Sequence, residues 1–254
     1  MDGPQAFIGV PDWRSAVLAA AFAVPWLWWI GRGWLKCRSL WLAVAIAAVL
    51  FPFSIAWIQV PLQSGLNALW SSLLDPATIR QYLLLLAIPS LLVASVVQEG
   101  VKVVVAILAL RLAGESRNPK AGLAFGAAAG AGYGGFEAFW VFNQIFAIGW
   151  SIAMVQLQGP QALLGFIERF FAVPFHIGSA AIAGYGYATG RFWRFWLLAV
   201  GLHTISNFSV VALQAGLIDL VVLELWVAFV ALVTGGVAIW LRRRCAETRV
   251  REGE

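Results

Sequence analysis

Long runs of apolar residues dominate this chain, and short clusters of polar and charged residues separate them. A run of about 20 apolar residues lets a helix cross the hydrocarbon core of a bilayer. The pattern predicts seven such helices: Ser15–Ile30, Leu40–Val60, Gln81–Leu112, Gly122–Ile148, Phe170–Thr189, Phe192–Gln214 and Ile218–Leu241. The predicted fold class is therefore all-α, a polytopic transmembrane helical bundle of about seven spans. Residues 1–254 form a single integral membrane domain in this interpretation, with a charged C-terminal tail at 242–254.

The segment between the second and third predicted spans has a different pattern. Leucines at 62, 66, 69 and 73 recur at helical spacing among Gln, Ser and Asn, which predicts a separate amphipathic helix at the membrane surface. Asp75 followed by Pro76 predicts an N-cap and the first residue of another helix. The third span is long enough to project beyond the bilayer or to kink at Pro89.

Composition excludes a water-soluble globule, because 61% of the residues are hydrophobic and only 11% are charged. The basic residues also predict an orientation, since loops rich in Lys and Arg stay in the cytoplasm. Most of them follow spans one, three, five and seven: Arg32, Lys36, Arg38, Arg111, Arg117, Lys120, Arg191, Arg194, Arg242, Arg243, Arg244, Arg249 and Arg251. The opposite side has only Arg14, Arg80 and Arg169, and Lys102 lies within a span.

This distribution predicts a multi-pass protein of the cell (plasma or inner) membrane, with the amino terminus outside and the carboxyl terminus in the cytoplasm. The net charge of +5 then reflects topology and contact with anionic lipid headgroups of the bilayer. It does not indicate a nucleic-acid partner, because the charges lie at helix ends rather than in a folded basic domain.

Several polar side chains lie deep inside the predicted spans. An ionisable group at bilayer depth costs several kcal/mol and is retained mainly where it functions. In the third span, Glu99 and Lys102 share one helix face with Ser95, and Gln98 lies at its edge. A Glu99–Lys102 ion pair that neutralises itself is the structural alternative to a functional role.

The fourth span begins with a ladder of glycines at 122, 126, 130 and 134. Small residues four apart predict close packing against a neighbouring helix. Glu137 continues the same face, so we expect its carboxylate to point into the bundle rather than toward lipid. Packing does not explain a carboxylate at this position, which favours a functional role.

The only two histidines, His176 and His203, lie in the fifth and sixth spans, and Asn207 follows His203 by one helical turn. A single histidine in a span is often only hydrogen-bonded to a neighbour, but two beside two carboxylates indicate a polar site. At about 1.5 Å per residue, these groups and the two glutamates all lie about 16–22 Å from the cytoplasmic ends of their spans. They can therefore meet in one layer.

At these positions the chain resembles the superfamily of intramembrane proteases that includes the CAAX-processing enzymes, and most of all its PrsW-type and YhfC-type branches. The resemblance covers about half of the chain, from Ser95 to Leu213, within a protease-like core of about 81–214. Its motifs are Gln98-Glu99-Gly100-Val101-Lys102, Gly132-Tyr133-Gly134-Gly135-Phe136-Glu137-Ala138, Phe175-His176 and His203-Thr204-Ile205-Ser206-Asn207.

The resemblance implies that a glutamate and a histidine activate water to attack a peptide bond of a membrane-anchored protein or peptide. The second histidine and Asn207 would stabilise the oxyanion. The sequence leaves the cofactor open between zinc and none. Glu137, His176 and His203 are the candidate metal ligands, but they do not form a compact HExxH helix.

One position departs from the family pattern. Gln98 stands where CAAX-type relatives have the first glutamate of a pair, the one assigned to water activation, and an amide cannot act as a general base. Three explanations stay open: the role belongs to Glu99 or Glu137, the chain is a natural pseudo-enzyme, or Gln98 is an engineered inactivation.

Two other classes of function compete with the peptidase. A proton-coupled transporter would also need carboxylates and histidines inside the membrane, although the sequence shows no internal repeat and no pair of broken helices. A catalytically inactive membrane scaffold would explain the glycine ladder but not the two histidines.

Overall fold

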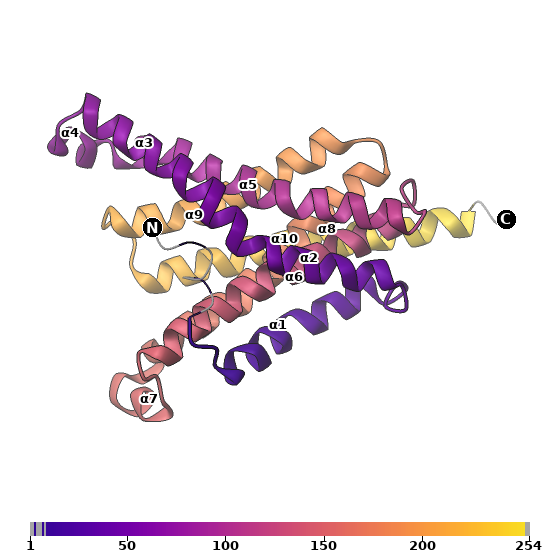
Figure 1. Ribbon diagram of the computed structural model, residues 1–254, viewed down its shortest axis with the longest axis horizontal. Coiled ribbons are helices and arrows are strands. Elements are labelled where there is room, and N and C mark those ends of the chain that lie inside the picture. The colour runs from indigo at the N-terminus through magenta and orange to yellow at the C-terminus, as the bar shows by residue number, and fades with distance from the viewer. Residues whose placement is uncertain (1–2, 4–6, 8, 252–254) are drawn as a thin grey trace.

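The computed structural model describes residues 3, 7 and 9–251, and the elements within them are helical (Figure 1). They are α1 Trp13–Gly31, α2 Arg38–Ser54, η2 Ile55–Gln59, α3 Val60–Leu73, α4 Pro76–Gln81, α5 Leu83–Leu112, α6 Pro119–Ala147, α7 Ile152–Gln158, η3 Gly159–Leu163, α8 Leu164–Ala188, α9 Phe192–Gln214 and α10 Leu220–Arg251. The predicted all-α bundle is confirmed.

Within the part of the chain that the structure describes, six helical stretches are long and apolar enough to cross a membrane: Trp13–Gly31, Arg38–Leu73, Leu83–Leu112, Ile152–Ala188, Phe192–Gln214 and Leu220–Cys245. The remaining predicted span is α6, which has 29 residues and lies at the centre, with α1, α2, α5 and α8 packed around it. Because neighbouring helices rather than lipid cover α6, glycine and alanine serve there in place of large apolar side chains. The protein is a multi-pass membrane protein.

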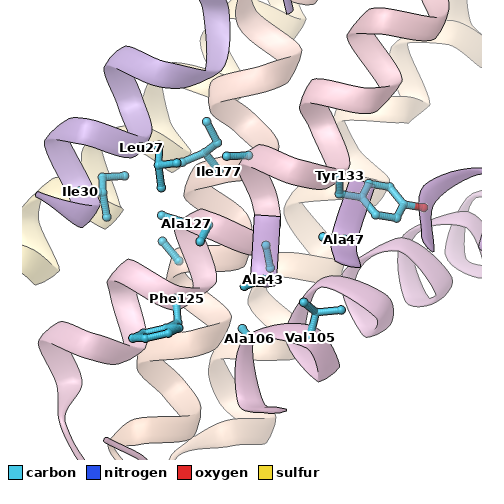
Figure 2. Packing of buried hydrophobic residues seen from close by; sticks show 14 of the residues in the cluster. Leu27, Ile30, Ala43, Ala47, Val105, Ala106, Phe125, Ala127, Tyr133 and Ile177 are labelled. Carbon is cyan, nitrogen blue, oxygen red and sulfur yellow. The ribbon is translucent and has the colours of Figure 1, made fainter. Parts of the chain in front are cut away.

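The glycine ladder packs α6 directly against α8, as the sequence predicts. A Cβ atom added at Gly126 would lie 2.2 Å from the carbonyl oxygen of Ala180, and one at Gly130 would lie 2.3 Å from that of His176. Gly132 makes an equally close approach to Val44 of α2 on another side of α6. Figure 2 shows this dense core, with Ala127 and Tyr133 of α6 among small residues of α2.

The prediction of a separate surface helix after the second span is wrong. Residues 38–73 form one continuous helical stretch, in which the π-helical turn η2 joins α2 to α3. The wider turn ends two residues before Pro61, which has no N–H to donate, and the helix continues through the proline without a break. In Figure 1, α3 and α4 project from one end of the bundle beside the start of α5. Asp75 caps α4 as predicted, accepting hydrogen bonds from the N–H groups of Ala77 and Thr78.

Two further boundaries differ from the sequence prediction. The fifth span begins at Leu164 rather than Phe170, so that Glu168 and Arg169 belong to α8. The predicted tail at 242–254 is not a separate segment, because α10 continues to Arg251 without a proline or glycine to end it. Residues 252–254 of that tail lie outside the described residues.

Candidate functional site

Four helices bring the polar residues of the sequence prediction to one place inside the bundle. Nδ1 of His203 on α9 lies 2.7 Å from Oε1 of Glu99 on α5. Nε2 of His176 on α8 lies 2.7 Å from Oε2 of Glu137 on α6. The two imidazole rings are 5.3 Å apart between centroids, so both pairs belong to one cluster. The expected convergence is present, and the catalytic role of these residues stays a prediction.

Lys102 lies between the two pairs, with its side chain fully buried. Its Nζ lies 2.7 Å from Glu99 Oε1, 2.9 Å from His176 Nδ1 and 3.2 Å from Ser179 Oγ. An ammonium group can only donate, so Nδ1 of His176 accepts and the ring proton lies on Nε2, facing Glu137. The Glu99–Lys102 ion pair expected from the sequence therefore exists. Lys102 does more than neutralise Glu99, because its contact with Nδ1 also fixes the tautomer of His176.

Glu99 is 0% exposed and its Oε1 already has three partners: Lys102, Ser179 and His203. Its other oxygen, Oε2, is buried without a hydrogen-bond partner among the described residues. The contact with Glu99 occupies Nδ1 of His203, which leaves Nε2 as the ring nitrogen available to other groups. Glu99 thus holds the ring of His203 in position, as a carboxylate orients the histidine base in catalytic triads.

A cavity of about 80 Å³ adjoins this cluster, which is large enough to hold water. Its polar lining consists of Gln98, Glu137, Glu168, Arg169, His176, His203, Ser206 and Asn207. Glu99 is not part of the lining. The side chain of Glu137 is 18% exposed, whereas that of Glu99 is fully buried, so Glu137 is the carboxylate placed to meet a water molecule.

Arg169 has a role at this site that its sequence position does not suggest. The sequence pattern places it only as a charge at the outer boundary, but in the structure its side chain is 11% exposed and pairs with two glutamates. Nη1 lies 3.0 Å from Oε1 of Glu137, and Nε and Nη2 bond to Glu168. Glu137 is therefore held between Arg169 and His176.

Glu224 on α10 is a carboxylate that the sequence analysis does not single out. It is 7% exposed, its Oε2 has no hydrogen-bond partner among the described residues, and its charge interacts with those of Glu168 and Arg169. It lies one residue from Leu223, which lines the cavity. The sequence does contain a sign that Glu224 is unusual, because it is an isolated carboxylate in an apolar run.

Gln98, the residue that departs from the family pattern, begins a row of carboxamides. Its Nε2 donates to Oε1 of Gln59 at 3.0 Å, Gln59 donates to Gln63 at 3.3 Å, and Gln63 donates to the carbonyl of Ser90 at 3.0 Å. Gln59 is the last residue of the π-helical turn, an element frequent at functional sites. The row joins the small cavity to a larger one of about 510 Å³ between α3, α4, α5 and α9, which Gln63 and Ser90 line.

The candidate metal ligands differ from the predicted set. The nitrogen and oxygen atoms that fall within 4.8 Å of one another belong to Glu99, His176 and His203, and Glu137 is not among them. Nζ of Lys102 lies within 3 Å of two of these residues, where it would face a bound divalent cation across a few Å. Two like charges at that separation repel strongly in a buried site. The donor set therefore does not fit zinc while Lys102 is charged.

Comparison of the chain with protein-family models, with curated proteins and with solved structures found no match.

Proposed function

We propose that this protein is an intramembrane peptidase that hydrolyses a peptide bond of a membrane-anchored protein or peptide. The observation that supports this function best is the common cavity: Glu137 of α6 lines it together with His203 and Asn207 of α9. A base, a titratable ring and an amide donor around space for water are the groups that peptide hydrolysis needs. The motif resemblance of residues 95–213 to intramembrane proteases supports the same proposal.

Glu137 acts as the general base in this mechanism, taking a proton from a water molecule that attacks the scissile carbonyl. Asn207 donates to the resulting oxyanion through its amide, and Nε2 of His203 donates when the ring is protonated. Glu99, 2.7 Å from Nδ1 of His203, stabilises that protonated ring. The step is a hydrolysis, in which the water oxygen becomes part of the new carboxylate and a proton passes to the leaving amine.

The cavity also favours one explanation for Gln98. Glu99 is fully enclosed and its Oε1 already has three partners, while Glu137 reaches the cavity, so the base role falls to Glu137. Gln98 then serves as a hydrogen-bonding group of the wall. A substrate would approach along the row of carboxamides from the larger cavity, whose Gln63, Asn67 and Gln214 side chains can bond to an unwound peptide main chain.

The experiment is a cleavage assay on purified protein in detergent micelles with a mixture of synthetic transmembrane peptides in ¹⁸O-labelled water, with products identified by mass spectrometry. We expect peptides with one ¹⁸O in each new carboxylate. Glu137→Gln should lower the rate by about 10²–10⁴-fold, the usual contribution of a general base. Glu115→Gln is the matched control, because Glu115 pairs with Asn118 in the α5–α6 loop, away from the cavity. Cleavage by Glu137→Gln at the wild-type rate would contradict the proposal.

A proton-coupled carrier is the second candidate, favoured by the row of charged and titratable groups from Glu168 to His203. Beyond Lys102, however, the next buried residues of α5 are Val103, Val105, Ala106, Ala109 and Leu110, which offer no polar path to the other side. Proton flux in liposomes separates the two candidates. A flux that Glu137→Gln abolishes, without any cleavage activity, would support the carrier.

The orientation belongs to the same proposal, with the cavity on the outer side and the basic loops in the cytoplasm of a cell membrane. Figure 1 shows α4 and α7 at one end of the bundle and the carboxyl-terminal end of α10 at the other. A cysteine introduced at Gly159 should react with an impermeant reagent on intact cells, whereas Cys37 and Cys245 should react only after permeabilisation. The reverse pattern would overturn the orientation.

A further inference from the structure

The end of the bundle opposite the candidate active site has two adjoining cavities with basic walls. One, of about 240 Å³, lies between the α1–α2 loop, the start of α6 and α10, and Arg32, Lys120 and Arg242 line it. The other, of about 290 Å³, has Trp29, Ile239 and Arg243 in its wall and shares Arg32 and Arg242 with the first. The two guanidinium groups are therefore common to a polar compartment and an apolar one.

The charges in this wall lack compensation among the described side chains. Arg32 and Arg242 repel each other, and Nη1 of Arg242 is buried without a hydrogen-bond partner among the described residues. The carboxylate of Glu115, on the same end of the bundle, bonds to Asn118 and does not line either cavity. Cations that converge from two helices and a loop, with a buried donor left over, indicate a site for an anion.

The cavity lined by Trp29 and Ile239 indicates what kind of anion fits the site. α1 packs against α6 and α8, and α10 packs against α8 and α9, so the apolar cavity opens where α1 and α10 face each other. Trp29 is 40% exposed there and stacks on Trp26, while Gly235 of α10 approaches the same Trp26 ring. A ligand that fills both cavities needs a phosphate beside an apolar chain.

We propose that these two cavities bind one anionic phospholipid of the bilayer. Its phosphate lies against Arg32, Lys120 and Arg242, and an acyl chain follows Trp29 and Ile239 between α1 and α10. Basic pockets between transmembrane helices recognise lipid headgroups in this way. The bound lipid ties α1 to α10 and to the start of α6, which stabilises the bundle at this end. This site does not depend on the proposed peptidase activity.

The experiment measures the melting temperature of the full-length protein in a zwitterionic detergent by tryptophan fluorescence. Phosphatidylglycerol is titrated against phosphatidylcholine and against inorganic phosphate. We expect phosphatidylglycerol to raise the melting temperature saturably, because a ligand that binds only the folded state stabilises it. Phosphatidylcholine and inorganic phosphate should have no saturable effect at the same concentration.

Arg242→Gln should weaken the phosphatidylglycerol effect about fivefold or more, and so should Arg32→Gln, whose exposed side chain leaves folding intact. Arg194→Gln is the matched control, an exposed arginine of the same predicted side that lines neither cavity. Equal weakening in all three variants would reduce the effect to general surface charge and overturn the site. An equal response to inorganic phosphate would overturn the lipid assignment.

Discussion

The same two helices, α6 and α8, meet in opposite ways along their length. Around Gly126 they touch backbone to backbone, with every residue of α6 from Ala121 to Gly134 buried. About three turns further along α6, Glu137 meets His176 of α8, and a polar cluster that reaches a cavity of about 80 Å³ replaces that contact. The closely packed part of the α6–α8 contact, around Gly126, is the dry half, and the part at Glu137 and His176 is the polar half. The dry half is rigid, so it can hold the side chains of the polar half at fixed distances from one another, as a functional site requires.

The largest expected effect comes from breaking the dry half. Gly126→Leu should abolish the folded protein, since even a Cβ atom there would lie 2.2 Å from the carbonyl oxygen of Ala180, which is backbone and cannot move aside. Gly201→Ala is the matched control, because a Cβ at Gly201 of α9 meets nothing within 4 Å. Recovery of monodisperse protein from membranes measures both variants. Normal recovery of Gly126→Leu would show that the α6–α8 contact is looser than described.

A smaller loss of stability should follow from removing the buried cation of the polar half, Lys102. Lys102→Met leaves Glu99 buried without its cation, which should lower the free energy of unfolding by about 3–5 kcal/mol. The double variant Glu99→Gln/Lys102→Met should recover a large part of this loss, because no charge is then stranded. Unfolding in a denaturing detergent measures both. If the double variant lost as much stability as Glu99→Gln and Lys102→Met lose together as single variants, the two charges would not stabilise each other.

The smallest effect is expected at the wall of the polar half. Gln98→Glu should change the cleavage rate by less than about tenfold, because Glu137 already supplies the base and residue 98 only bonds to Gln59. The matched variant Gln59→Glu alters the other end of the same hydrogen bond. A rate increase of about 10²-fold or more in Gln98→Glu alone would move the base role to position 98 and away from Glu137.

The close packing of the glycine ladder could be predicted from the sequence, because glycines four residues apart define a helix face by periodicity alone. The convergence of Glu99, Glu137, His176 and His203 was also predictable, since depth in the bilayer follows from counting residues along a helix. Which carboxylate pairs with which histidine was not, because it depends on the rotation of each helix about its axis.

Three other features could not be predicted from the sequence pattern, because they also depend on how the helices are placed in three dimensions. Lys102 of α5 reaches His176 because the fold places α8 beside α5, a tertiary effect. Arg169 looked like a boundary charge because the apolar run begins after it, yet the helix begins at Leu164. The continuous path of α2 into α3 depends on a π-helical turn, for which the sequence carries no simple signal.

One face of α8 should differ in water accessibility along its length, and this difference can be measured without knowing any substrate. Ala172 lines the cavity, and Ala183, eleven residues further along the same face of α8, is fully buried among Val103 and Ala199. In a background with Cys37 and Cys245 replaced by serine, we expect Ala172→Cys to react with a charged thiol reagent at least about 10²-fold faster than Ala183→Cys, because water reaches only the first position. Equal rates at the two positions would contradict a water-filled site above a dry contact.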